Sequence, residues 1–192
     1  MAGFRIIDHW LHGAQRVLSP NQSERPADAG ISLLVIHNIS LPPGQFGGPW
    51  ISDLFCNRLS PDFHPYFAGI CQLQVSAHLL IRRDGVIVQY VSFDRKAWHA
   101  GDSVFEGRET CNDFSIGIEL EGTDEVPFTD LQYEHLQLVT GLLLAAYPAI
   151  TPARIAGHSD IAPGRKTDPG PCFDWGRYRQ GLENFPTTNS PS

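Results

Sequence analysis

Residues 75–91 read Val-Ser-Ala-His-Leu-Leu-Ile-Arg-Arg-Asp-Gly-Val-Ile-Val-Gln-Tyr-Val, which is two apolar runs joined by a short polar turn. Asp84-Gly85 suits a tight turn between antiparallel strands, because glycine adopts a positive φ without steric cost. The pattern therefore predicts a β-hairpin with strands at residues 75–81 and 86–91.

Three further strands are predicted around this hairpin. The apolar, branched run at residues 31–37 is typical of a buried strand, and a shorter strand is expected at residues 154–157. Residues 114–122 alternate between branched apolar side chains on one face and Glu119 and Glu121 on the other. Two carboxylates are therefore expected to share one face of that strand.

The clearest helix is predicted at residues 130–147. Thr129 and Gln132 form the pattern of a capping box at its start, and a proline stops it. Apolar residues recur at helical spacing and predict an amphipathic helix; they are Leu131, Leu138, Leu142 and Ala146. Shorter helices are expected at residues 50–59 and 174–184.

Strands and helices are mixed, but the hairpin breaks strict strand–helix–strand alternation. This favours an α/β fold of the mixed α+β type, with a central mixed sheet flanked by helices, over a doubly wound parallel sheet. A length of 192 residues fits one domain. We expect that domain to span residues 1–192, with a core at about residues 10–184 and a frayed tail at residues 185–192.

Composition argues against several classes of protein. The chain is 42% hydrophobic and 18% charged, which is too apolar for a disordered chain. A net charge of −7, without long runs of Lys or Arg, argues against nucleic-acid binding. The purely apolar stretch at residues 142–147 is far shorter than the roughly 20 residues of a bilayer span. The first residues do not resemble a secretory signal, so we expect a cytoplasmic protein. Its four cysteines lack metal-binding spacing and are too few for a disulfide framework, so we expect buried thiols.

Eight histidines are present, and two of them stand where predicted strands leave the core. His37 and His158 each directly follow an apolar run, and side chains at strand ends often carry chemistry in α/β proteins. Lys166 and Asp168 follow closely after His158, between turn residues. This density of functional groups is unusual for a plain surface loop.

These residue types suit a catalytic zinc site. Two imidazoles and one carboxylate leave one position of a tetrahedral zinc ion open, and such an ion activates water near neutral pH. Either Glu119 or Glu121 could accept the proton of that water, and Lys166 could stabilise an oxyanion. The alternative is structural: the two histidines cap strands, and Lys166 pairs with Asp168 at the surface.

The remaining histidines are predicted to have mainly structural roles. His135 falls in the middle of the long helix and is expected to pack there, whereas His64 is expected to brace a loop. His78 falls on the less apolar face of its strand. Residues 94–111 lack periodicity, and an irregular segment of that length is a candidate wall of a functional site.

Several motifs together resemble a known family. They are Val35-Ile-His-Asn-Ile-Ser-Leu-Pro-Pro-Gly44, Phe46-Gly-Gly-Pro-Trp50, His64-Pro-Tyr-Phe-Ala-Gly69, Val75-Ser-Ala-His78, Ala97-Trp-His-Ala-Gly101, Cys111-Asn-Asp-Phe-Ser-Ile-Gly-Ile-Glu-Leu-Glu-Gly-Thr-Asp124 and Arg165-Lys-Thr-Asp-Pro-Gly-Pro171. Over roughly residues 10–180 the chain is similar to the zinc-dependent N-acetylmuramoyl-L-alanine amidases of the second amidase family. It most resembles the members that act on 1,6-anhydro-muropeptides.

The resemblance implies a site. His37, His158 and Asp168 match the ligands of one zinc ion per chain. Glu119 matches the catalytic carboxylate, because the motif Ile-Gly-Ile-Glu-Leu-Glu-Gly selects the first of its two glutamates. Lys166 matches the residue that stabilises the tetrahedral intermediate.

The resemblance also implies a fold and a reaction. The fold is a central mixed sheet flanked by helices, shared with peptidoglycan recognition proteins. The reaction is hydrolysis of the amide bond between the lactyl group of 1,6-anhydro-N-acetylmuramic acid and L-alanine, in cytosolic peptidoglycan recycling. Related bacteria use this step to control the muropeptides that signal β-lactamase induction.

Loop residues are candidates for substrate binding. They are Asn38, Tyr66, Trp98 and Arg108. Trp98 offers a face for the sugar and Arg108 a partner for peptide carboxylates, although each of the four could instead brace its loop. Cys172 departs from the family motif, which has a small hydroxyl residue there, and we expect a thiol near the site that is not a ligand.

Two other functions remain open at this stage. An autolysin or phage-type amidase would share the metal site but cut polymeric wall, and it normally carries a signal peptide or wall-binding repeats. A recognition protein of the same fold would bind muropeptide without hydrolysis, and it normally lacks a complete ligand set. We expect a small-molecule anhydro-muropeptide substrate and no nucleic-acid, membrane or obligate protein partner.

Overall fold

The computed structural model describes residues 3–183. The predicted tail at residues 185–192, and Asn184 at the end of the predicted last helix, lie outside these described residues. The fold is organised around a six-stranded sheet with strand order β12-β5-β11-β6-β7-β3. Its strands are β3 (Gln15–Arg16), β5 (Leu33–Ile39), β6 (Leu79–Ile81), β7 (Ile87–Gln89), β11 (Ser115–Glu121) and β12 (Ile155–Gly157).

The sheet is mixed, as the sequence predicts. β5, β11 and β12 run parallel, and β6 is parallel to β11. β6 and β7 pair antiparallel as the predicted hairpin, with Gly85 at φ +82° in its turn. β3, which the sequence does not predict, adds in parallel to β7 at the edge of the sheet.

Shorter elements surround this sheet. The small strands are β1 (Arg5–Ile7), β2 (Trp10–His12), β4 (Gln22–Ser23), β8 (Lys96–Ala97), β9 (Val104–Phe105) and β10 (Arg108–Glu109). The helices are α1 (Trp50–Phe55), α2 (Asp130–Ala146), α3 (His158–Ile161) and α4 (Trp175–Glu183), with short 3-10 turns η1 (Pro61–Phe63), η2 (Pro65–Gly69), η3 (Cys111–Asp113) and η4 (Pro152–Arg154). Within residues 3–183, no helix has the length and apolar character needed to cross a membrane.

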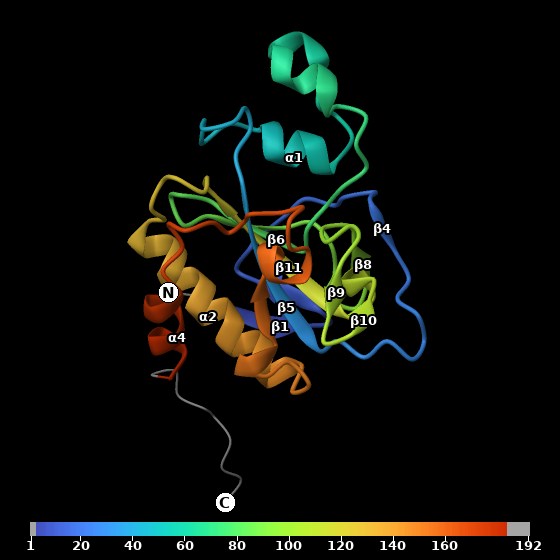
Figure 1. Ribbon diagram of the computed structural model, residues 1–192, viewed down its shortest axis with the longest axis vertical. Helices are drawn as coiled ribbons and strands as arrows, with labels where there is room; N and C mark the ends of the chain where they lie inside the picture. Colours follow the sequence, from blue (N-terminus) through green and yellow to red (C-terminus); the bar gives the residue numbers. More distant parts are fainter. Residues whose placement is uncertain (1–2, 184–192) are drawn as a thin grey trace, which may run out of the picture.

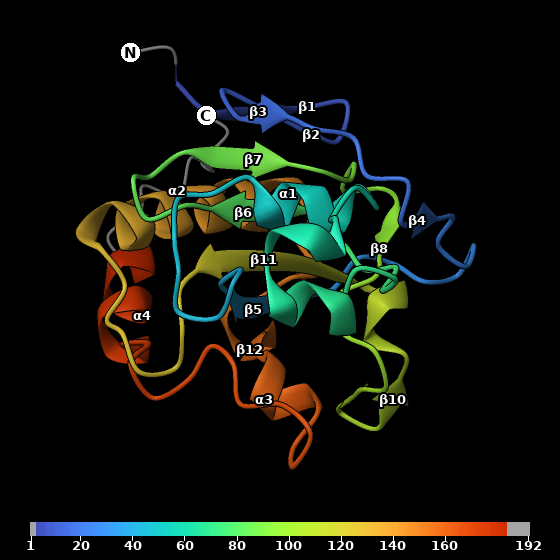
Figure 2. The ribbon, with the colours of Figure 1, turned by 90° about the horizontal axis from the view of Figure 1, so that it is seen from above.

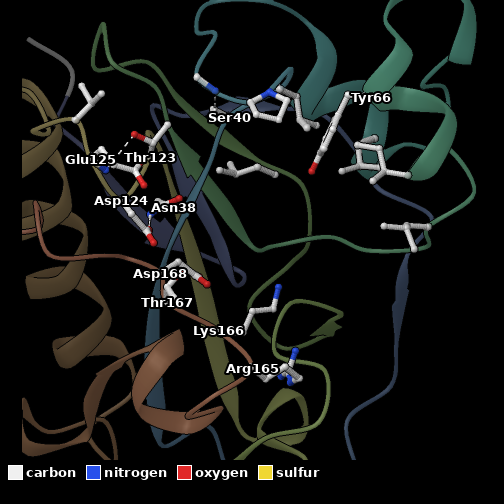
Figure 3. A pocket seen from close by; sticks show the side chains of 18 residues that line it. Asn38, Ser40, Tyr66, Thr123, Asp124, Glu125, Arg165, Lys166, Thr167 and Asp168 are labelled. Atoms are coloured by element: carbon white, nitrogen blue, oxygen red, sulfur yellow. Dashed lines mark hydrogen bonds between the residues drawn. The ribbon is translucent and has the colours of Figure 1, made fainter.

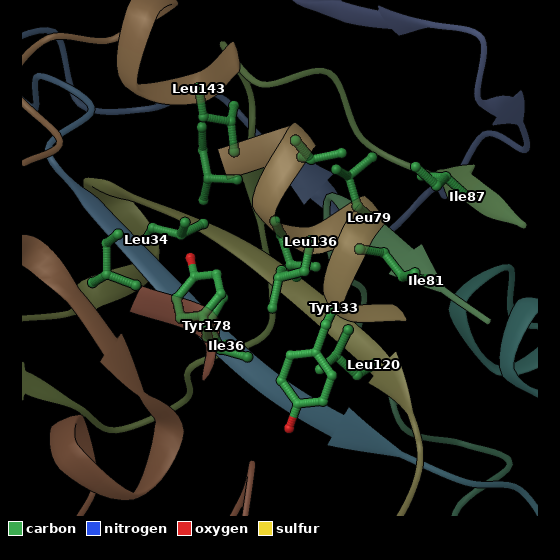
Figure 4. Packing of buried hydrophobic residues seen from close by; sticks show 14 of the residues in the cluster. Leu34, Ile36, Leu79, Ile81, Ile87, Leu120, Tyr133, Leu136, Leu143 and Tyr178 are labelled. Carbon is green, nitrogen blue, oxygen red and sulfur yellow. The ribbon is translucent and has the colours of Figure 1, made fainter. Parts of the chain in front are cut away.

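Helices cover both faces of the sheet (Figures 1 and 2). α2, with α4 packed beside it, covers one face, and α1 with the η2 turn lies on the other. Neighbouring residues of β6 show this division, because Leu79 and Ile81 pack in the α2 cluster while Leu80 packs in the α1 cluster. Figure 4 shows the α2 side, where leucine and isoleucine side chains of the sheet meet Leu136 and Leu143.

α2 begins as predicted but buries a different face. The Gln132 amide donates to Thr129 Oγ1 at 3.3 Å, and the Thr129 amide donates to Gln132 Oε1 at 3.0 Å, which completes the capping box. The prediction of the apolar face was wrong at Leu131, which is 45% exposed beside the hairpin turn, and at Ala146, which is also exposed. The other two predicted residues, Leu138 and Leu142, pack against the core but are only partly buried. The residues that pack against the sheet are Tyr133, Leu136, Val139 and Leu143.

The parallel strands bring distant residues to one edge of the sheet. β5 extends two residues beyond its predicted end, so His37 lies inside the strand and is not its last residue. Glu119 of β11 lies directly opposite His37 in the register, and Gly157 of β12 lies opposite Ile36. His158 follows Gly157 and begins α3, a helix that the sequence does not predict. Two histidines and a glutamate therefore meet where three parallel strands end.

Candidate metal centre

The predicted ligands converge at this sheet edge. His37 Nδ1 lies 3.0 Å from His158 Nδ1, and each of these nitrogens lies 3.0 Å from Asp168 Oδ2. The three donor atoms thus form a nearly equilateral triangle. Ligand atoms at the corners of a tetrahedron, about 2.0–2.1 Å from zinc, lie about 3.3 Å apart. The triangle therefore fits three corners of such a tetrahedron and leaves the fourth open.

Hydrogen bonding and burial prepare these groups for a cation. His158 Nε2 lies 3.0 Å from Ala100 O and donates to it, so the lone pair of the ring is on Nδ1. Burial lowers the pKa of His37 to about 4, which keeps its imidazole neutral. Burial acts to raise the pKa of Asp168, but its close contacts with the imidazoles of His158 and His37, each 3.0 Å away, outweigh this and hold the pKa well below its usual range. Neutral imidazoles and a carboxylate are the ligand types that zinc accepts.

Glu119 lines the same hollow as the three donor residues. Its side chain is 9% exposed, and within the described part of the chain its Oε2 makes no hydrogen bond. Burial, and then the nearby Asp168 carboxylate, raise the pKa of Glu119 well above its usual value, while Lys166 opposes the shift. A buried carboxyl that lacks partners is costly for stability, and a raised pKa suits it to accept and return a proton.

Two connected hollows lie over these groups. The inner one, of about 230 Å³, is lined by His37, Trp98, Glu119, His158, Lys166 and Asp168, among others. The outer groove, of about 700 Å³, shares Asn38, Lys166 and Asp168 with it and extends past Tyr66. Figure 3 shows Tyr66 on one side of this groove, with Lys166 and Asp168 across from it. A long substrate can therefore lie in the groove with one bond at the donor triangle.

Comparison with known proteins agrees with this geometry. Residues 27–171 match the family model of N-acetylmuramoyl-L-alanine amidases.

The chain belongs to this amidase family.

Relatives of this amidase are similar over nearly their whole length. The 1,6-anhydro-N-acetylmuramyl-L-alanine amidase AmpD of Citrobacter freundii is 64% identical over 174 residues, which is 91% of this chain and 92% of the relative. A crystal structure of a selenomethionine derivative of AmpD superposes with a TM-score of 0.90 at 61% identity, covering 92% of this chain and 98% of the other. The expected amidase fold is therefore confirmed.

A more distant relative has been seen with a substrate. The amidase AmiD from E. coli, in complex with anhydro-N-acetylmuramic acid-L-Ala-D-γ-Glu-L-Lys, is 30% identical, with a TM-score of 0.57. The match covers 94% of this chain and 66% of that one.

The predicted substrate-binding residues of the amidase have different surroundings. Trp98 is half-buried, lines the inner hollow, and donates from Nε1 to Ser23 Oγ at 3.2 Å. Tyr66 is 46% exposed at the groove. Asn38 lines both hollows but also braces the ligand loop, because its Nδ2 donates to Asp124 Oδ1 at 2.7 Å and to Pro169 O at 3.1 Å.

Arg108 and Cys172 are not among the residues of the donor triangle. The Arg108 guanidinium lies 4.0 Å from the centroid of the Phe114 ring, and Arg108 lines neither hollow, so its role as a carboxylate partner stays a prediction. All four cysteines are free thiols, but the prediction that they are buried is correct only for Cys111, since Cys56, Cys71 and Cys172 are half-buried. The donor cluster found among residues 3–183 does not include Cys172.

Glu121, which the strand pattern alone could not distinguish from Glu119, has a different task. It is 3% exposed, and its carboxylate accepts from Gly47 N at 2.6 Å and from Arg83 N at 3.1 Å. Glu121 thereby ties the loop after β5, which forms a wall of the groove, to the hairpin turn.

Sequence reasoning gave no role to His99. Its Nδ1 lies 2.9 Å from His37 Nε2, and its ring lines the inner hollow. The sequence feature that could have pointed to His99 is the aperiodic segment at residues 94–111, which was predicted to form a wall of the site. Trp98 and His99 of that segment line the inner hollow.

Three other histidines, His64, His78 and His135, make structural contacts. His64 accepts from Tyr66 N at 3.1 Å at the start of η2. His135 on α2 bonds to Gly85 O at 2.6 Å through Nδ1. His78 accepts from Gly117 N at 3.0 Å inside the sheet.

Proposed function

We propose that this amidase hydrolyses the amide bond between the lactyl group of 1,6-anhydro-N-acetylmuramic acid and L-alanine in soluble muropeptides, in cytoplasmic recycling of peptidoglycan. The observation that carries the proposal is the donor triangle of His37, His158 and Asp168 next to Glu119, whose Oε2 has no hydrogen-bond partner among the described residues. The 64% identity to a relative named for this substrate supports it.

We propose His37, His158 and Asp168 as the ligands of one zinc ion per chain. Their 3.0 Å triangle and the neutral imidazole of His37 support this assignment. When bound, zinc supplies the Lewis acid that polarises the scissile carbonyl and lowers the pKa of the attacking water.

Glu119 is the proposed proton carrier. Its Oε2 has a free acceptor site, so the carboxylate takes the proton of the water as the oxygen attacks the carbonyl carbon. The protonated carboxyl then donates that proton to the alanine nitrogen as the C–N bond breaks. A raised pKa helps this second step, because the acid form must persist until the nitrogen leaves.

Lys166 is the proposed stabiliser of the tetrahedral intermediate. Its side chain lines both hollows, on the loop between His158 and Asp168, so its ammonium group can face the oxygen that becomes negative. Trp98 is proposed to contact the sugar in the inner hollow, with Asn38 and Tyr66 along the groove. The complex of AmiD with an anhydro-muropeptide supports a substrate of this chemical class in the groove.

The proposed enzyme is one amidase domain that spans residues 1–192, with its core at about residues 10–184. In the described part of the chain, this is supported by one continuous sheet whose strands come from residues 15–157. No protein partner enters the proposed reaction, because every group that it uses comes from this chain.

The test is mass spectrometry of products from anhydro-muramoyl-tripeptide and, separately, from intact sacculi, each with and without a chelator. We expect free tripeptide from the soluble substrate, abolished by the chelator. Efficient release from sacculi would instead indicate an enzyme of the polymeric wall. No cleavage of either by zinc-loaded protein would indicate a muropeptide-binding module.

Lys166→Ala tests the role of the ammonium group in the same assay. We expect kcat to fall by about 10²–10³, the usual effect of removing one oxyanion donor, while zinc content stays near one per chain. Wild-type turnover in this variant would contradict the role.

A further inference from the structure

One short segment, residues 98–101, contacts both imidazole ligands on the side opposite the donor triangle. His37 Nε2 lies 2.9 Å from His99 Nδ1, and His158 Nε2 lies 3.0 Å from Ala100 O. Neighbouring residues of one segment therefore hold the outer nitrogens of two ligands that come from distant strands.

The hydrogen bonds fix where the protons are. For both Nδ1 atoms to face a cation, both Nε2 atoms must carry hydrogen and donate outward. His158 then donates to Ala100 O, and His37 donates to His99 Nδ1. His99 in turn carries its own proton on Nε2 and donates to Ser115 Oγ at 3.1 Å. Each of these three imidazole N–H groups therefore has an acceptor, and one set of tautomers satisfies all three hydrogen bonds.

The segment itself is anchored by Asn112. Asn112 Oδ1 accepts from His99 N at 3.1 Å and from Ala100 N at 2.9 Å. Arg165 Nη2 donates to Ala100 O at 2.7 Å, beside the bond from His158. One oxygen of Asn112 thus holds the backbone of both residues that contact the Nε2 atoms of the ligands, His99 and Ala100.

Gly117 leaves the space that the His99 ring fills. A Cβ at Gly117 would lie 2.5 Å from His99 Cγ and Nδ1, closer than real Cβ contacts allow. The ring therefore stands directly on the backbone of β11, edge to face with His37 at 84° and 4.9 Å between centroids. This close packing restricts rotation of the His99 ring.

We propose that His99 is a positioning residue of the metal centre, and that Asn112 holds it in place. His99 Nδ1 accepts from His37 Nε2, which fixes the tautomer and the ring plane of His37 so that its Nδ1 faces the ion. The inference rests on the zinc site of the proposed function. Outer partners of this kind typically account for a 10–100-fold difference in metal affinity.

The decisive experiment compares His99→Leu with His99→Asn. The two side chains have nearly the same shape, but only Asn places an acceptor oxygen close to the position of His99 Nδ1. Zinc dissociation constants are measured by competition with a chromophoric chelator for the wild type and both variants. We expect His99→Leu to weaken zinc binding by about 10–100-fold and His99→Asn to recover most of that loss.

His135→Leu is the matched control, because it removes an imidazole on α2 that bonds to Gly85 O, remote from the ligands. Its zinc affinity should equal that of the wild type. If His99→Leu does not fold, Asn112→Ala tests the same segment, since it frees the amides of His99 and Ala100 and should also weaken zinc binding.

The outcomes separate the two proposals. A wild type that does not bind zinc would overturn the zinc site itself. Tight binding by the wild type and equally tight binding by His99→Leu, or by Asn112→Ala in its place, would overturn only the role of His99. Equal weakening in the Leu and Asn variants would also overturn it, because the acceptor would then be irrelevant.

Discussion

The two faces of β11 are built for different purposes. On one face, Ile116, Ile118 and Leu120 are almost fully buried in the α2 cluster. On the other face, Glu119 and Glu121 are also buried, but as carboxyl groups that need partners. One face therefore stabilises the sheet, while the other carries the groups that cost stability unless they are hydrogen-bonded.

The polar face contains a second contrast. Glu121 accepts from two backbone amides, whereas Oε2 of Glu119, two residues away, has no hydrogen bond among residues 3–183. Both are buried on the same strand face, so exposure does not distinguish them. The number of partners distinguishes the structural carboxylate from the one available for chemistry.

Glu119→Gln should give the largest effect. Without a group that accepts the proton of water, kcat should fall by about 10²–10⁴, while zinc content stays near one per chain. Thermal stability should stay equal or rise, because a costly buried carboxyl is replaced by a neutral amide. Turnover, metal analysis and thermal unfolding check the three parts. Glu134→Gln, on the exposed side of α2, is the control. Wild-type turnover in Glu119→Gln would contradict the proposal that Glu119 carries the proton.

Ile118→Ala tests the opposite face. It removes a fully buried side chain from the α2 cluster and should lower the free energy of unfolding by about 2–5 kcal/mol. Urea denaturation at fixed zinc concentration measures this loss. Below the melting temperature kcat should stay near the wild-type value, and a large loss of kcat in the folded variant would show that the two faces are not independent.

Glu121→Ala should have a smaller effect and a different kinetic signature. It removes the acceptor for the amides of Gly47 and Arg83, at a cost of about 1–3 kcal/mol in the free energy of unfolding. Because the loop that carries Gly47 walls the groove, KM should rise with kcat nearly unchanged. Glu121→Gln retains one acceptor oxygen, so its free energy of unfolding should fall less and its KM should rise less than in Glu121→Ala. A fall in kcat without a change in KM would place Glu121 in the chemistry instead.

The smallest effect is expected at His78, which directly precedes β6 and accepts a hydrogen bond from the Gly117 amide of β11. Burial, and then Arg25, lower the pKa of His78 to about 3. In the unfolded chain the pKa of His78 is near 6.5, so between about pH 3 and pH 6.5 the unfolded chain binds more protons at this residue than the folded protein does. The contribution of neutral His78 to the free energy of unfolding is therefore fully present above about pH 6.5 and is lost as the pH falls.

His78→Asn isolates this contribution. From pH 6 to pH 5 the wild type should lose about 1 kcal/mol more in the free energy of unfolding than His78→Asn does. Denaturant titrations at both pH values provide the comparison. Parallel losses in the two proteins would show that His78 does not titrate in this way.

Local patterns predicted the elements whose stability is local. The hairpin follows from its turn residues, the start of α2 from Thr129 and Gln132, and the two faces of β11 from strict alternation. The resemblance selected the three residues whose donor atoms the structure brings within 3.0 Å.

Features that depend on distant contacts were not predictable in this way. Leu131 has helical spacing but lies against the hairpin turn, and only the packing of α2 on the sheet decides which stripe is buried. β3 has two residues and forms because β7 offers an edge. The contact of His99 with His37 joins an aperiodic loop to a strand 62 positions away, so no local pattern contains it.

The parallel arrangement of β12, β5 and β11 has a consequence for how the protein is made. His37 and His158 are 121 positions apart, and β12 joins the sheet late in the chain, at its edge beside β5. During synthesis a nascent chain that ends before Asp168 has no complete donor triangle, however well its hairpin has formed. A metal ion bound by all three donors is therefore acquired only after β12 has docked and Asp168 has been added, so a molecule with a fully coordinated ion is also one whose central sheet is assembled.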